Sequence, residues 1–230
     1  MCGRISQARD LMDYAESIGM PPDAIFDIMP PPRRFNVAPG SKVLGIHMLD
    51  GEHYTAEPMR WGYHSGWAKS EGRPADINAT IEKALGRYWK SLWMHGRMIV
   101  PADGWYEWTG EKPNKQPWFI RPKDQAPMFI AAVSNWKPDP AERAEDAGFA
   151  IVTSASMGGM VDVHDRRPIV LTARDAMEWV DMSNSAEYAE NLARTAALPS
   201  DAFEWYQVTK AVGSYRNDGP EMVKPISSDS

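Results

Sequence analysis

The chain has 230 residues, of which 43% are hydrophobic, and a formal net charge of −6. This length fits one large domain or two small ones, and ten tryptophans supply enough apolar surface for a core, which excludes a disordered protein. A single cysteine excludes a disulfide framework or a cysteine-based metal cluster, and the acidic balance argues against a general nucleic-acid binder without a local basic patch.

The only cysteine is Cys2, directly after the initiator methionine. Because aminopeptidases remove Met1 when the second residue is small, we expect the mature protein to begin with Cys2. Its α-amine and thiol would then form a 1,2-aminothiol, which condenses with an aldehyde to an imine and closes to a thiazolidine. Both groups titrate near neutrality, at about 8 for the amine and about 8.5 for the thiol. The alternative is that Cys2 is an accident of a flexible terminus.

The first part of the chain predicts a helix followed by a hairpin. Apolar spacing over residues 10–18 is typical of a helix that ends at a glycine. After a proline-rich loop, residues 42–49 and 53–61 predict two strands around an Asp-Gly turn. Residues 81–93 indicate a second helix.

The second part is rich in short strands. They are predicted at residues 97–100, 104–108, 117–121, 128–133, 149–153 and 203–208, with helices at 174–182, capped by Thr172, and at 186–197. Short strands with interspersed helices and no βαβ rhythm predict a single α+β domain. We expect a curled, mostly antiparallel, barrel-like sheet with flanking helices over residues 1–224, and a disordered tail at 225–230.

The strand at 104–108 carries a carboxylate among aromatic residues. Alternation places Trp105 and Glu107 on one face, and Tyr106 and Trp108 on the other. Desolvation on such a face raises the pKa of a carboxyl group, so Glu107 is a candidate general acid or base. The alternative is an edge-strand carboxylate that faces water or pairs with a cation.

Other polar and aromatic loops also suggest chemistry. In the segment from His164 to Pro168, the histidine could move protons and the arginines Arg166 and Arg167 could bind phosphate, although an isolated run of this kind is more often a structural salt-bridge corner. Asn78 precedes a predicted helix, where a cap or an Asx turn is the alternative. The loop at 61–67, which includes Trp67, offers either a platform for stacked bases or a cover for the core.

Several motifs follow one another in a distinctive order. They are Met1-Cys2-Gly3-Arg4, the segments 34–40, 61–62, 77–79, 102–108 and 163–168, and Ala211-Val212-Gly213 followed by Asn217. This order resembles the SRAP (SOS response-associated peptidase) family over residues 2–224. The resemblance implies a single α+β domain with a positively charged groove for single-stranded DNA. It also implies a protein that traps abasic sites as a thiazolidine DNA–protein crosslink through the mature N-terminal cysteine, which protects the lesion during the DNA damage response.

The resemblance assigns the reactive residues position by position. Cys2 would form the crosslink, Asn78 would orient the sugar or the amine, Glu107 would be the acid or base, and His164 would assist ring opening and imine chemistry. A weak abasic-site lyase reaction and a thiol autopeptidase activity are further implications. We expect no cofactor and no metal.

Arg4, Asn36, Trp67 and Arg166 match positions that contact DNA in the family. Members often carry arginine where this chain has Thr80, and an arginine there contacts phosphate. We therefore expect Thr80 to weaken DNA affinity, to shift where the DNA lies, or to alter substrate preference.

The remaining expectations concern location and rival functions. No apolar run is long enough to cross a bilayer and the first ten residues hold no secretory core, so we expect a cytoplasmic monomer, associated with the nucleoid in a bacterium, with no membrane partner. One rival is an N-terminal nucleophile amide hydrolase or peptidase, which predicts amide turnover and no covalent DNA. The other is a non-catalytic single-stranded-DNA-binding module, which predicts that Cys2→Ala functions normally.

Overall fold

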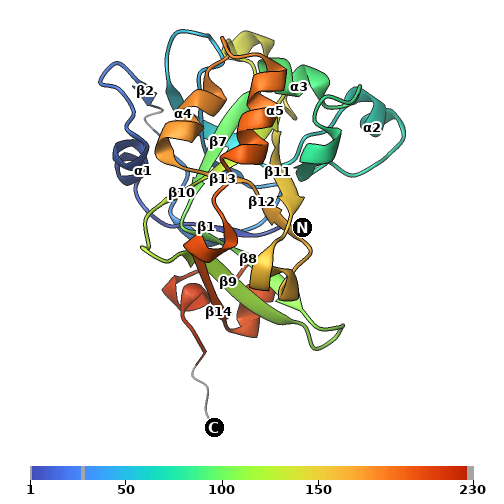
Figure 1. The fold of residues 1–230 in the computed structure, drawn as a ribbon. Helices are drawn as coiled ribbons and strands as arrows, with labels where there is room; N and C mark the ends of the chain where they lie inside the picture. The colour runs from blue at the N-terminus through green and yellow to red at the C-terminus, as the bar shows by residue number, and fades with distance from the viewer. Residues whose placement is uncertain (1, 27–28, 227–230) are drawn as a thin grey trace.

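The computed structural model describes residues 2–26 and 29–226, so Met1 and residues 227–230 of the predicted tail lie outside the described residues. Its strands form two largely antiparallel sheets (Figure 1). The smaller sheet has the order β14 (Phe203–Gln207), β9 (Gln116–Pro122), β8 (Gly104–Thr109), β1 (Ile5–Gln7) and β3 (Arg34–Val37).

The larger sheet runs from β12 (Arg166–Pro168) through β11 (Phe149–Ala155), β10 (Met128–Ser134), β7 (Arg97–Ala102), β4 (Lys42–His47) and β5 (Thr55–Arg60) to β2 (Ile25–Phe26). Two further strands join it, β13 (Val170–Leu171) beside β10 and β6 (Asn78–Thr80) parallel to β11. Within the described residues, β12 and β2 do not pair with each other. The α+β class is therefore confirmed, whereas the barrel-like core is wrong because both sheets are open.

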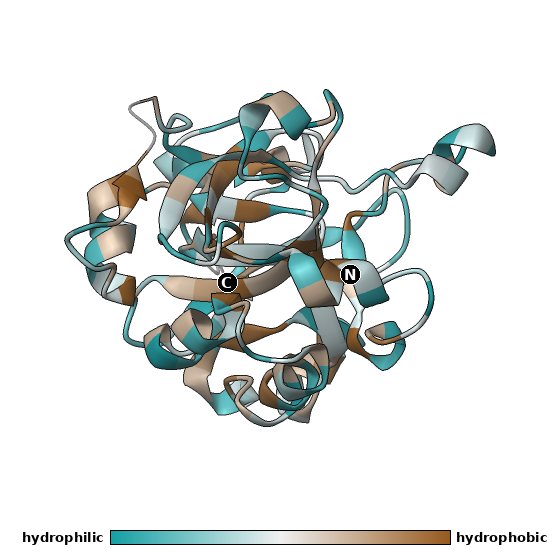
Figure 2. Ribbon diagram, turned by 90° about the horizontal axis from the view of Figure 1, so that it is seen from above, coloured by the Kyte–Doolittle hydropathy of each residue, from teal (hydrophilic) through white to brown (hydrophobic). Residues whose placement is uncertain are grey.

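Helices cover one face of the larger sheet. They are α1 (Leu11–Ile18), α3 (Lys90–His95), α4 (Ala173–Val180) and α5 (Ala186–Thr195), and α2 (Gly66–Ser70) lies to one side (Figure 1). One buried apolar cluster fills the space between these helices and the sheet, and a second lies between the two sheets. Figure 2 shows the hydrophobic residues gathered on the central strands, with hydrophilic residues on many of the loops.

Most of the predicted elements are present. The hairpin at 42–61 forms as β4 and β5, and Thr172 caps α4 because its hydroxyl accepts from the backbone N–H of Asp175 at 3.2 Å. The continuous helix predicted at 81–93 is wrong. The chain forms a 3-10 turn at Ile81–Lys83 and begins α3 only at Lys90, with Gly86, a poor helix former, in the break.

The end of the described chain is tied to the smaller sheet. Val208 forms a bridge with Pro225, and the backbone N–H of Ile226 donates to the Gln207 carbonyl at 3.0 Å. Within the described residues, no helix is long and apolar enough to cross a membrane.

Candidate functional site

Cys2 is held at the junction of the two sheets. Strand β1 begins three residues later and pairs on both sides, since Ile5 lies opposite Val37 of β3 and opposite Trp105 of β8. The Cys2 side chain is fully buried in the cluster between the sheets. The pairing of β1 therefore fixes a residue that the sequence alone would leave in a frayed terminus.

Asn78 fastens Cys2 from the larger sheet. Its side-chain Nδ2 donates to the Cys2 carbonyl at 2.9 Å, across a separation of 76 residues. Asn78 is itself placed by β6, which pairs in parallel with β11 so that Asn78 lies opposite Ile151. The backbone that carries the amine and thiol of Cys2 thus has a defined orientation.

Glu107 lies on the same face of β8 as Trp105, as the alternation predicted. Trp105 joins the cluster around Cys2, whereas Tyr106 packs on the opposite face against Phe119, with ring centroids 4.9 Å apart. Burial raises the pKa of Glu107 to about 7. The direction agrees with the sequence-based expectation, and a carboxyl with this pKa can both donate and accept a proton near neutral pH.

Burial acts on the thiol of Cys2 in the same direction. Burial raises its pKa well above the usual range, and the charge of Glu107 raises it further. The resting group is therefore a neutral thiol. Its conversion to a nucleophile would need a base close by.

His164 completes the group. Its Nε2 lies 3.8 Å from Oε2 of Glu107, and its Nδ1 lies 2.8 Å from Asp165 and 3.0 Å from the backbone N–H of Arg166. A neutral ring can accept the N–H of Arg166 at Nδ1, whereas an imidazolium can donate to Asp165 instead. Burial lowers the pKa of His164, and Asp165 opposes this change. His164 can therefore exchange a proton with Glu107 from its neutral form.

The structure thus brings Cys2, Asn78, Glu107 and His164 together. Their catalytic roles stay predictions. Among the described residues, no group of three or more His, Cys, Asp or Glu side chains is arranged to hold a metal ion.

Three of the predicted DNA contacts, Arg4, Asn36 and Arg166, are engaged within the protein. Arg4 donates from Nη1 to Oδ1 of Asn36 at 2.6 Å and to the Val212 carbonyl at 2.7 Å. Asn36 is fully buried and donates to the carbonyls of Val212, Ser214 and Asn217 at 3.2, 3.0 and 2.7 Å. Asn36 therefore ties the C-terminal segment to β3, and its role as a DNA contact stays a prediction.

Arg166 and Thr80 lie on either side of β11. Arg166 pairs with both carboxylate oxygens of Glu82, at 2.8 and 2.9 Å, and donates to the Thr153 carbonyl. Thr80, the last residue of β6, is half-buried and lies opposite Thr153 of β11. A phosphate that approached Arg166 would have to compete with Glu82.

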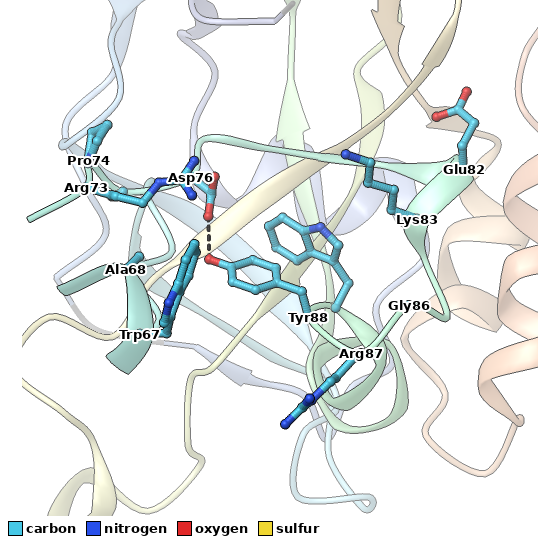
Figure 3. Close-up of a pocket in the computed structure, with 12 residues that line it drawn as sticks. Trp67, Ala68, Arg73, Pro74, Asp76, Glu82, Lys83, Gly86, Arg87 and Tyr88 are labelled. Atoms are coloured by element: carbon cyan, nitrogen blue, oxygen red, sulfur yellow. Dashed lines mark hydrogen bonds between the residues drawn. The ribbon is translucent and has the colours of Figure 1, made fainter. Parts of the chain in front are cut away.

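Trp67 stands on α2 and is 54% exposed, beside a pocket of about 560 Å³ (Figure 3). The guanidinium of Arg73 lies 4.9 Å from its ring centre, and Tyr88 meets it edge to face at 6.3 Å. Three cations, Arg73, Lys83 and Arg87, line this pocket together with the carboxylates of Asp76 and Glu82. The sequence reasoning missed Lys83 and Arg87 because it assigned the segment 81–93 to a helix.

Comparison with known proteins identifies relatives over the whole chain. The family model described as "SOS response associated peptidase (SRAP)" matches residues 1–215. The Abasic site processing protein YedK of Escherichia coli (strain K12) is 42% identical over 229 residues, covering 98% of this chain and 100% of that protein. The Abasic site processing protein YoqW of Bacillus subtilis (strain 168) is 31% identical, covering 97% and 99%.

Solved structures agree with this relationship. A phage-related protein from Bordetella bronchiseptica is 40% identical, with a TM-score of 0.76 over 91% of this chain and 95% of that chain. A protein from Bacteroides thetaiotaomicron, at 21% identity, has a TM-score of 0.74 over 98% and 100%, and supports the fold alone.

Proposed function

Since this chain belongs to the SRAP family, we propose that it processes abasic sites in DNA by trapping them covalently through Cys2. The observation that carries the proposal is the placement of Cys2, which Asn78 holds by its carbonyl beside a buried carboxyl with a pKa of about 7. A reactive residue at a chain end is useful only if its backbone is fixed. All of the groups come from one chain, so a monomer suffices.

The reaction begins with the sugar. An abasic deoxyribose is mostly a closed hemiacetal, and proton transfer at His164 assists its opening to the aldehyde. The free amine of Cys2, available once Met1 is removed, adds to the carbonyl carbon. Protonated Glu107 then donates to the departing hydroxyl, so that water leaves and an imine forms.

Ring closure makes the adduct durable. The thiol of Cys2 adds to the imine carbon, forming the S–C bond, while its proton passes through Glu107 to the imine nitrogen. The product is a thiazolidine, and one water is lost overall. An imine that fails to close can undergo β-elimination, which accounts for a weak lyase side reaction. The chemistry needs a reduced thiol, which fits the cytoplasmic location predicted from the sequence.

We propose single-stranded DNA as the substrate because of the pocket beside Trp67. Its exposed indole, with Tyr88 and the cations Arg73, Lys83 and Arg87, fits an unstacked base and its adjoining phosphates. The two carboxylates of the pocket are engaged within the protein, since Asp76 accepts from the hydroxyl of Tyr88 and Glu82 pairs with Arg166. A continuous duplex does not offer an unstacked base.

The test uses a single-stranded oligonucleotide with one abasic site. The expected product survives a denaturing gel, and its intact mass equals protein without Met1 plus DNA minus one water. An oligonucleotide with a tetrahydrofuran in place of the abasic sugar has no aldehyde and should give no adduct. Cys2→Ala should abolish the adduct, and Cys2→Ser should leave only a reversible one. An equally stable adduct in Cys2→Ala, or quantitative retention of Met1, would contradict the proposal.

A further inference from the structure

A second arginine of the polar loop is buried without a counter-charge. Arg167 lies on β12 opposite Ser154 of β11 and is only 6% exposed. Within the described part of the chain, its guanidinium makes no hydrogen bond or ion pair; its Nε is enclosed, whereas Nη1 and Nη2 are not. Its neighbour Arg166, by contrast, pairs with Glu82.

Arg167 lines a pocket of about 600 Å³, here named the Arg167 pocket. Its walls are mainly apolar or small, and its described lining residues are Ile81, Glu82, Ser154, Ala155, Met157, Gly158, Arg167, Ala193, Arg194, Ala197, Pro199, Ser200 and Asp201. None of these side chains is aromatic. The pocket therefore offers the guanidinium of Arg167 and aliphatic walls, and no stacking surface for a base. Its two serine hydroxyls donate to backbone carbonyls, Ser200 to Met157 at 2.6 Å and Ser154 to Ala155 at 3.5 Å.

The Arg167 pocket is separate from the Cys2 site. Along β11, Ile151 joins the cluster that contains Cys2, whereas Val152 joins the cluster beneath the helices, which includes Ala193 of α5. Because side chains alternate, Ser154 and its partner Arg167 lie on the helix side of the sheet. Figure 1 shows β12 close to α5.

None of the other charged residues that line the Arg167 pocket forms an ion pair with Arg167 within the described residues. Glu82 is paired with Arg166, and Arg194 is paired with Glu190 at 2.7 Å. Asp201 lies exposed, and no ion pair joins it to Arg167 within the described residues. A buried cation of this kind is costly, and an anionic group supplied from outside would be stabilised there.

We propose that the Arg167 pocket binds the C-terminal carboxylate and the apolar last side chain of a partner protein. A single carboxylate matches the fork of one guanidinium, and the aliphatic walls accommodate the adjoining side chain. Asp201 and the lack of aromatic rings disfavour a polyanionic strand with its bases. The inference goes beyond the proposed function and does not depend on chemistry at Cys2.

The smallest probes with this chemistry are N-acetyl-leucine and N-acetyl-phenylalanine, titrated into the full-length protein and followed by NMR. We expect binding in the millimolar range, and at least tenfold weaker binding of the corresponding amides and of N-acetyl-serine. Arg167→Met should abolish the preference for the carboxylate. Arg174→Met, on an arginine whose side chain is 86% exposed on α4, should leave it unchanged.

Further measurements keep the test decisive. Without ligand, Arg167→Met should raise the melting temperature because it removes a buried charge that has no counter-charge within the described part of the protein. Should that variant fail to fold, Ala197→Trp fills the pocket with Arg167 intact and should also block binding. No binding of either acid at 20 mM, or equal binding of acid and amide, would overturn the inference. Loss of affinity for intact single-stranded DNA or inorganic phosphate in Arg167→Met would also overturn it. We expect abasic-site crosslinking by this variant to be unchanged.

Discussion

Replacing Glu107 by glutamine should make the protein slower and, above neutral pH, more stable. Glutamine has the shape of the protonated carboxyl but cannot ionise or shuttle a proton. If Glu107 moves protons during dehydration and ring closure, crosslinking should slow by roughly 10²–10⁴-fold, the usual effect of general acid–base catalysis. Binding of intact single-stranded DNA should be preserved, because Glu107 is buried.

The stability change follows from the raised pKa. Burial moves the pKa of Glu107 from 4.5 to about 7, and at about 1.4 kcal/mol per pH unit this is about 3 kcal/mol. Below pH 4.5 the carboxyl is protonated in both the folded and the unfolded chain. Between that pH and about 7, the unfolded chain ionises while the folded one keeps its proton, so wild-type stability falls as the pH rises. Above about pH 7 the folded carboxyl is ionised as well, and wild-type stability falls no further.

Glu107→Gln escapes this loss, so its advantage should be below about 1 kcal/mol at pH 5 and about 3 kcal/mol at pH 8. Urea unfolding followed by tryptophan fluorescence measures it, and with an m-value of about 3 kcal/mol/M the midpoint should rise by about 1 M at pH 8. Glu111→Gln, in the exposed turn after β8, is the matched control and should change neither rate nor midpoint. A variant that is equally or less stable at pH 8 would refute the assignment of the raised pKa to burial.

Other substitutions test the nucleic-acid contacts and the fold. Glu82→Gln should free Arg166 from its ion pair, so anisotropy titrations with intact single-stranded DNA should show tighter binding and a log–log salt slope steeper by about 0.7; an unchanged slope would mean that Arg166 does not reach phosphate. Thr80→Arg should likewise add about one phosphate contact, and unchanged affinity and slope would place Thr80 away from the DNA. Asn36→Ala should lower the free energy of unfolding by about 2–4 kcal/mol, since a buried amide with several hydrogen bonds is lost; urea unfolding that shows no change would mean that other contacts hold the C-terminal segment.

Local patterns were enough to predict many of the elements. The spacing over 10–18, the turn between β4 and β5 and the cap at Thr172 act within a few residues, and the structure has all of them. The helix predicted at 81–93 failed at Gly86, where the gain from apolar spacing does not offset a poor helix former. Strands β1 and β3 were not predicted, because a strand of three or four residues has little pattern of its own and is defined by its partners.

The sequence by itself determined which groups are candidates for the chemistry: a lone cysteine at position 2, a carboxylate on an aromatic strand face, and the motifs around Asn78 and His164. Only the tertiary structure decided how they meet. It buries Cys2 between two sheets, fastens it to Asn78 across 76 residues, and commits Asn36 and Arg166 to partners within the protein. Alternation and capping are local, whereas these contacts depend on which surfaces pack together, and that is settled only when the whole core is formed.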